Sequence, residues 1–201
     1  MVFENNAHGP AIIVLILFLA LLFGLLIYYF IKNEGKYKKV LRDQALKRNG
    51  IVSSGLLSGG FTLNFEHNLN QVKIWLFSSR NATRTYFEIK LYKKSNQNML
   101  IYKETFLSKV GKKLGMEDIE IGYDGFDKEV ILKGSDENFI RKILTYNIQE
   151  DILKTIKKYS ARIYLKDDFF QIMVPIFIKT NKSFDEIMDL SLRIVDKINK
   201  L

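Results

Sequence analysis

The chain has 201 residues and carries 31 Lys and Arg against 22 Asp and Glu, a net charge of +9. It contains no cysteine, which excludes a disulfide framework and any thiolate nucleophile or metal ligand. Its only two histidines are His8 and His67, so imidazole-based catalysis and metal binding are effectively excluded as well, and no cofactor is expected. The length is sufficient for one substantial hydrophobic core.

An apolar run occupies residues 11–31, which include no charged side chain. At 1.5 Å rise per residue, a helix of this length matches a hydrocarbon core of ~30 Å. A cleaved signal peptide would have a basic start, a shorter apolar stretch and small residues before the cleavage point, and none of these is present. The sequence therefore predicts an uncleaved transmembrane helix over 11–31, preceded by a short extracytoplasmic tail over 1–10.

Basic residues are dense directly after the predicted span, with seven Lys and Arg and two acids in residues 32–48. Because Lys and Arg beside a membrane helix are retained in the cytoplasm, we expect the N-terminus outside the cell membrane and the C-terminal domain in the cytoplasm. Each basic side chain near an anionic leaflet adds about 1 kcal/mol of attraction. The basic juxtamembrane segment 32–49 is therefore predicted to lie along anionic lipid head groups, with contacts from Lys36, Lys38, Lys39 and Arg42.

Two small residues of the predicted span, Ala20 and Gly24, are four positions apart and so share one face of a helix. Small residues let membrane helices approach closely. We therefore predict helix packing at this pair, either by self-association or against another membrane protein. A nucleic acid is not expected as a partner, because the basic segment adjoins the bilayer and no nucleic-acid-binding motif accompanies it.

The remaining residues, 50–201, are predicted to form one domain whose first half consists of strands. Alternating patterns rich in aromatic and β-branched residues predict strands over 61–65, 72–77 and 85–92, with 99–106 as the hairpin partner of the third. Trp75 is expected in the core of this sheet. Short connections between the strands indicate antiparallel pairing.

The second half of the domain mixes helices and strands. A strand over 129–132 precedes a helix that begins at Ser135 or Asp136, and a second helix is capped by Thr145 or Asn147. A hairpin follows over 161–165 and 169–178, and the final helix is predicted to open with a capping box of Ser183 and Glu186. The fold class is therefore α+β, an N-terminal transmembrane helix followed by a mostly antiparallel sheet with helices packed on one face.

Residues 114–144 contain a D-I-x-x-G element, an F-D pair before a strand, a K-G-x-D turn and a helix that ends in I-L-T. This segment resembles an uncharacterised family of membrane-anchored prokaryotic α+β proteins, and the resemblance implies an architecture but no activity. The physical roles of its residues are structural. We expect Phe126 as a core anchor, Asp127 and Asp136 as turn or cap acceptors, and Gly134 as a turn position.

No group of residues predicts a reaction. Acids are frequent over 117–129, but their spacing does not match an EF-hand loop, and His67 is expected to be a polar turn residue. We predict a single-pass membrane protein whose cytoplasmic domain is a binding or assembly module, an accessory or scaffold component of a membrane complex. The alternative is a membrane-tethered enzyme or small-ligand-binding domain that uses carboxylate or Lys groups at a concave face of the sheet.

Overall fold

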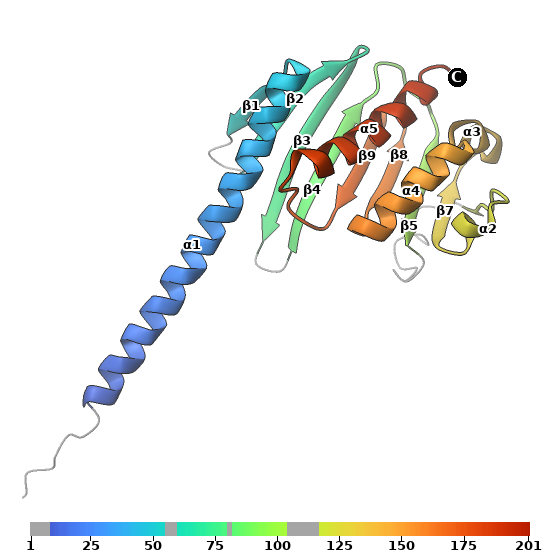
Figure 1. Cartoon of the computed structure of the whole chain (residues 1–201). Coiled ribbons are helices and arrows are strands. Elements are labelled where there is room, and N and C mark those ends of the chain that lie inside the picture. Colours follow the sequence, from blue (N-terminus) through green and yellow to red (C-terminus); the bar gives the residue numbers. More distant parts are fainter. Residues whose placement is uncertain (1–8, 55–59, 80–81, 104–116) are drawn as a thin grey trace, which may run out of the picture.

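The structure is a computed structural model that describes residues 9–54, 60–79, 82–103 and 117–201. Within the first range, the side chains of residues 9–11, 26 and 29–34 lie outside the described part. Figure 1 shows a long N-terminal helix, one end of which lies over a broad twisted sheet, and further helices packed on the same face of that sheet.

Helix α1 (Gly9–Arg48) has 40 residues. Its N-terminal part projects away from the rest of the molecule, and its C-terminal part crosses β1 and β2 (Figure 1). The large apolar side chains described between Ile12 and Tyr28 are all exposed, by 42% to 66%. Within the described part of the chain, no helix combines the length and the apolar character that a membrane crossing requires.

The described strands form one antiparallel sheet in the order β1-β2-β3-β4-β9-β8-β5-β7-β6. Their bounds are β1 Ile51–Ser54, β2 Phe61–His67, β3 Asn70–Ser79, β4 Ala82–Lys90, β5 Asn98–Lys103, β6 Glu117–Asp118, β7 Val130–Gly134, β8 Arg162–Lys166 and β9 Phe169–Val174.

The other helices are α2 (Asp124–Asp127), α3 (Glu137–Ile143), α4 (Tyr146–Tyr159) and α5 (Asn181–Ile198). Helix α5 lies between α1 and α4, against β4 and β9 (Figure 1). Its apolar stripe packs on the sheet, and the rings of Phe184 and Phe87 are 5.1 Å apart between centroids. The predicted α+β class, with a mostly antiparallel sheet and helices, is thus confirmed.

The predicted pairing of 99–106 with 85–92 is wrong. Strand β4 pairs instead with β9 from the C-terminal hairpin, through Thr85 opposite Val174, and β5 pairs with β7 and β8. The end of the predicted strand, 104–106, lies outside the described residues. The β8–β9 hairpin is itself as predicted, with Lys166 opposite Phe169. Strands β4 and β5, which are consecutive in the sequence, are therefore separated in the sheet by the β8–β9 hairpin.

Two of the predicted helix starts are confirmed and one is wrong. The Asp136 carboxylate accepts a hydrogen bond from the Phe139 amide at 3.0 Å and caps α3, and Thr145 is the N-cap residue of α4. Helix α5 begins one turn earlier than the predicted capping box, because Thr180 is its N-cap and accepts from the amide of Ser183. The other predicted member of that box, Glu186, contacts α4 instead.

Among the described residues of 114–144, the roles expected for Phe126, Asp127 and Asp136 are confirmed. The turn position expected at Gly134 is wrong, because this residue is paired within the sheet, opposite Met99 and Glu117. Phe126 is fully buried, and the Asp127 carboxylate accepts hydrogen bonds from the amides of Ile121 and Gly122 at 3.2 and 2.8 Å. Gly134 ends β7, where an added Cβ would collide with the side chain of Ile140. This glycine permits close packing of α3 on the end of the sheet.

Candidate functional site

The C-terminal half of α1 is part of the domain, whereas residues 32–49 were expected to lie apart from it as a surface segment. Tyr37, Val40, Leu41 and Gln44 are buried, and their spacing of three and four positions puts them on one face of the helix. The Tyr37 ring packs edge-on against Phe177 at 6.2 Å between centroids. This half of the helix therefore contributes to the hydrophobic core.

Ion pairs fix the end of α1 to α5. Arg48 donates from its guanidinium to Asp185 at 2.9 Å and to Asp189 at 3.2 Å, and the Lys47 ammonium lies 2.9 Å from Asp185. One turn away, the Asn181 amide donates to Asp43 at 2.9 Å. We call the ion pairs of Lys47 and Arg48 with Asp185 and Asp189 the α1–α5 clamp.

The cations of the clamp stabilise the charged form of Asp185. Partial burial by itself would raise the pKa of Asp185, but hydrogen bonds from Lys47 and Arg48 outweigh that effect and the pKa is lowered. Sequence reasoning missed this pairing, because nothing in the local pattern at 47–48 links it to acids far along the chain. The i, i+4 spacing of Asp185 and Asp189 marks one exposed helix face and no more.

The residues predicted to contact lipid lie on the outer side of this half of α1. Lys36, Lys39 and Arg42 are exposed, while Lys38 is half-buried with its ammonium 4.3 Å from the centroid of Phe61. Contact of these four side chains with lipid head groups stays a prediction.

The small pair predicted to pack against another helix lies in the projecting half of α1. Ala20 and Gly24 are both exposed, and no atom lies within 4 Å of a Cβ built at Gly24. The space for a close partner is therefore open, and helix packing at this pair also stays a prediction.

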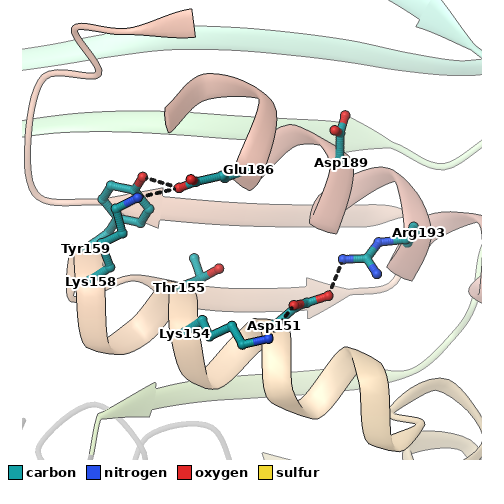
Figure 2. A pocket seen from close by; sticks show the side chains of 8 residues that line it. All are labelled: Asp151, Lys154, Thr155, Lys158, Tyr159, Glu186, Asp189 and Arg193. Carbon is teal, nitrogen blue, oxygen red and sulfur yellow. Dashed lines mark hydrogen bonds and ion pairs between the residues drawn. The ribbon is translucent and has the colours of Figure 1, made fainter. Parts of the chain in front are cut away.

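A groove of about 700 Å³ runs between α4 and α5. Figure 2 shows a cluster of interacting polar side chains at each end of it. At one end, the Tyr159 hydroxyl and the Lys158 ammonium both donate to one carboxylate oxygen of Glu186 at 2.6 Å. At the other end, the Arg193 guanidinium donates to Asp151 at 2.6 Å. The groove is lined by Asp151, Lys154, Thr155, Lys158, Tyr159, Glu186, Asp189 and Arg193.

The charged groups of this groove satisfy one another. Hydrogen bonds from Lys158 and Tyr159 lower the pKa of Glu186, and the bond to Glu186 in turn raises the pKa of Lys158. Lys154 lies 3.5 Å from Asp151, and Asp189 is held by the clamp. Each of these carboxylates thus faces a cation. Such an arrangement joins two helices and holds no poised acid, base or nucleophile.

The acids of 117–129 are likewise dispersed among separate contacts. Lys133 pairs with Asp118, Lys128 with Asp124, and Lys157 with Glu129. In the described ranges no three His, Asp or Glu residues converge as a metal site would require. His67 ends β2 beside a turn, 3.4 Å from Asp196. The core position expected for Trp75 is wrong. This side chain is half-buried on the sheet face opposite the helices, stacked on Tyr86 at 4.2 Å, and donates a hydrogen bond to Glu88.

The fold and the clamp define a single α+β domain to which a long N-terminal helix is fixed by its last three turns. A similar fold is found in the crystal structure of the mycobacterial trehalose monomycolate transport factor A, TtfA, with a TM-score of 0.57 and 9% sequence identity. The match covers 84% of this chain and 93% of that one. At this identity the likeness concerns the fold alone. No protein-family model and no curated protein matches the sequence.

Proposed function

We propose that this chain is a single-pass membrane protein that presents its α+β domain in the cytoplasm as a binding or assembly module, an accessory component of a membrane complex. One observation carries the proposal. A single helix, α1, exposes every large apolar side chain described between Ile12 and Tyr28, and the same helix is built into the core of the domain from Tyr37 onward. A bilayer would remove the exposed half from water.

The length of the apolar run supports this proposal. It extends over residues 11–31 of the sequence, although the side chains at 11, 26 and 29–31 lie outside the described part. The charged residues begin at Lys32, and the buried positions of the domain begin at Tyr37. The bilayer boundary and the domain are therefore separated by about one to two helical turns. A domain held this closely would follow the orientation of its anchor.

A binding or assembly role is favoured over an enzyme because the charged side chains of the α4–α5 groove are paired with one another. The structurally similar protein is named a transport factor. An accessory role in a membrane complex is compatible with that name. At this groove the alternative, a membrane-tethered enzyme or small-ligand-binding domain, would have to use carboxylate or Lys groups that are released from these ion pairs.

The experiment for this proposal compares the full chain with a variant that lacks residues 1–31. We expect the full chain to stay with membranes through alkaline carbonate extraction and the shortened chain to be released. Protease added to sealed cells should leave the domain intact, because the basic residues after the span favour the cytoplasmic side. Extraction of the full chain by carbonate would contradict the anchor, and digestion from outside would contradict the orientation.

A further inference from the structure

Strands β3 and β4 extend beyond the rest of the sheet as a two-stranded ribbon. Strand β2 pairs with β3 only as far as Trp75, and β9 pairs with β4 only up to Thr85. Beyond these positions, residues 77–79 and 82–84 pair, within the described part of the chain, only with each other, with Phe77 opposite Arg84. Phe77 is 42% exposed on this ribbon, and Arg84 is exposed as well.

The ribbon projects in the direction in which α1 leaves the domain. The Arg48 guanidinium lies 5.7 Å from the centroid of Phe65, and the Lys38 ammonium lies 4.3 Å from that of Phe61. Toward its N-terminus, α1 therefore runs along β2 from Phe65 to Phe61, which is the end of the sheet where the ribbon begins. Figure 1 shows the end of β3, the start of β4 and the projecting part of α1 on this same side.

The reach of the ribbon matches the end of the apolar run. Leu76 follows Trp75, which is opposite Thr62, so it lies about level with Phe61 and hence with the Lys38 ammonium. Three residues beyond Leu76 extend a strand by about 10 Å. The same distance along α1 is about seven residues, counted back from Lys38. The ribbon therefore ends about level with residue 31, the last apolar position before Lys32. If residues 11–31 cross the bilayer, the ribbon reaches the head groups.

The loop between β9 and α5 lies at the same end. The Thr85 hydroxyl donates to the carbonyl oxygen of Ile176 at 2.7 Å, and Phe177 packs on Tyr37 of α1. Ile176 itself is 42% exposed, and Lys179 follows it on the surface. The loop thus bridges the base of the ribbon and the emerging helix.

We infer that this membrane-facing end, formed by Phe77 and Arg84 of the ribbon, Ile176 and Lys179 of the loop, and Lys36 and Lys39 of α1, is a second contact of the protein with an anionic bilayer. The inference rests on the proposed membrane anchor. Among the described residues none of these four cations has an ion-pair partner. Exposed apolar side chains next to Lys and Arg suit the boundary between head groups and acyl chains, where the apolar groups contact acyl chains and the cations contact anionic head groups.

The contact gives the domain a fixed orientation. A helix alone would let the domain tilt about its point of exit, whereas a ribbon and a loop beside the helix add two further points of support. The sheet would then stand on the bilayer, with the α4–α5 groove and the open sheet face directed sideways. Partners in a membrane complex would meet these surfaces at a defined height.

The test uses the absence of cysteine from the chain, which allows single spin labels on the full-length protein in vesicles of phosphatidylcholine and phosphatidylglycerol. Ser78→Cys places the label on the exposed ribbon, and Leu69→Cys places a control at the opposite end of β3, where Leu69 is 68% exposed. We expect the label at position 78 to be protected from a water-soluble nickel complex and the label at 69 to be fully accessible. In vesicles of phosphatidylcholine alone, the protection at 78 should decrease.

A second variant tests the charges. Arg84→Glu and Lys179→Glu, added to Ser78→Cys, should restore access of the nickel complex, and protection that is unchanged would contradict the contact with anionic head groups. Carbonate extraction of the same vesicles separates the two proposals. Protein that resists extraction but has equally accessible labels at 78 and 69 overturns this inference alone. Protein that is extracted overturns the anchor and, with it, this inference.

Discussion

The two halves of α1 are one continuous helix with opposite surroundings. In the N-terminal half, apolar side chains follow one another around the whole circumference, and all those described are exposed. In the C-terminal half, apolar positions recur every three or four residues, and those positions are buried against β2 and α5 while Lys and Arg occupy the outer side. Periodicity, more than apolar content, therefore marks the part of a helix that belongs to a protein core.

The largest expected effect on stability comes from removing a buried side chain in the domain half of α1. Leu41→Ala should lower the free energy of unfolding by about 2 to 5 kcal/mol, because Leu41 is fully buried and its loss leaves a cavity. The matched control is Leu17→Ala in the projecting half, where the side chain touches no part of the domain core. Chemical denaturation in the same detergent, followed by Trp75 fluorescence, measures both. Equal losses would contradict the division of α1 into two halves.

The fold class and several local features could be predicted from sequence, because they depend on neighbouring residues. The cap at Asp136, the core position of Phe126 and the β8–β9 hairpin are of this kind. The place of β9 beside β4 could not be predicted, since strand order depends on contacts between residues about 90 positions apart, such as Thr85 and Val174. Local patterns contain no information on which edge a distant hairpin will join.

The C-terminal half of α1 was misjudged for a different reason. Its charge density is typical of a segment beside a membrane, and the prediction followed that density instead of the helical spacing of the residues that are buried. These residues are Tyr37, Val40, Leu41 and Gln44. The helix start at Thr180 was missed because Ser183 and Glu186 have the spacing of a capping box. In the structure Glu186 is one turn too far into the helix for that role, and it binds Tyr159 and Lys158 of α4 instead.

The clamp offers a smaller and pH-dependent perturbation. Asp185→Asn should lower the free energy of unfolding by about 1 kcal/mol at pH 7, because Lys47 and Arg48 would lose a charged partner. The pKa of Asp185 is lowered from its usual 3.8, so its stabilising effect is present at neutral pH and disappears as the pH falls below about 4. Wild type and variant should therefore converge in acid. Asp189→Asn, which removes a single more exposed contact, is the control and should cost less.

Two buried tyrosines, Tyr37 and Tyr159, should respond to removal of the hydroxyl with stability changes of opposite sign. Burial raises the pKa of Tyr37, whose hydroxyl has no hydrogen-bond partner among the described residues. Tyr37→Phe removes a desolvated polar group and should raise the free energy of unfolding by about 1 kcal/mol. Tyr159→Phe should lower it by about 1 kcal/mol, since the bond to Glu186 is lost. Urea denaturation of the two variants that gave changes of the same sign would refute this reasoning.

The smallest expected effect concerns the projecting half. Gly24→Ile should weaken self-association, or co-purification with a membrane partner, by about 1 kcal/mol or less, because a bulky side chain keeps helix backbones apart. Insertion should be unaffected, as Ile is favourable in hydrocarbon. Leu15→Ile, a change of shape at an already bulky position, is the control for sedimentation in one detergent. Unaltered association of the Gly24 variant would leave α1 as a simple tether.

One measurement tests directly whether α1 is a membrane element in its first half and a domain element in its second. Leu17→Cys and Leu46→Cys place single thiols on exposed positions of the two halves, in a chain with no other cysteine. A membrane-impermeant maleimide is added to open membrane fragments, which expose both leaflets. The account predicts that the thiol at 46 reacts fully and that the thiol at 17 reacts only after detergent is added. Equal reaction of both thiols before detergent would contradict it.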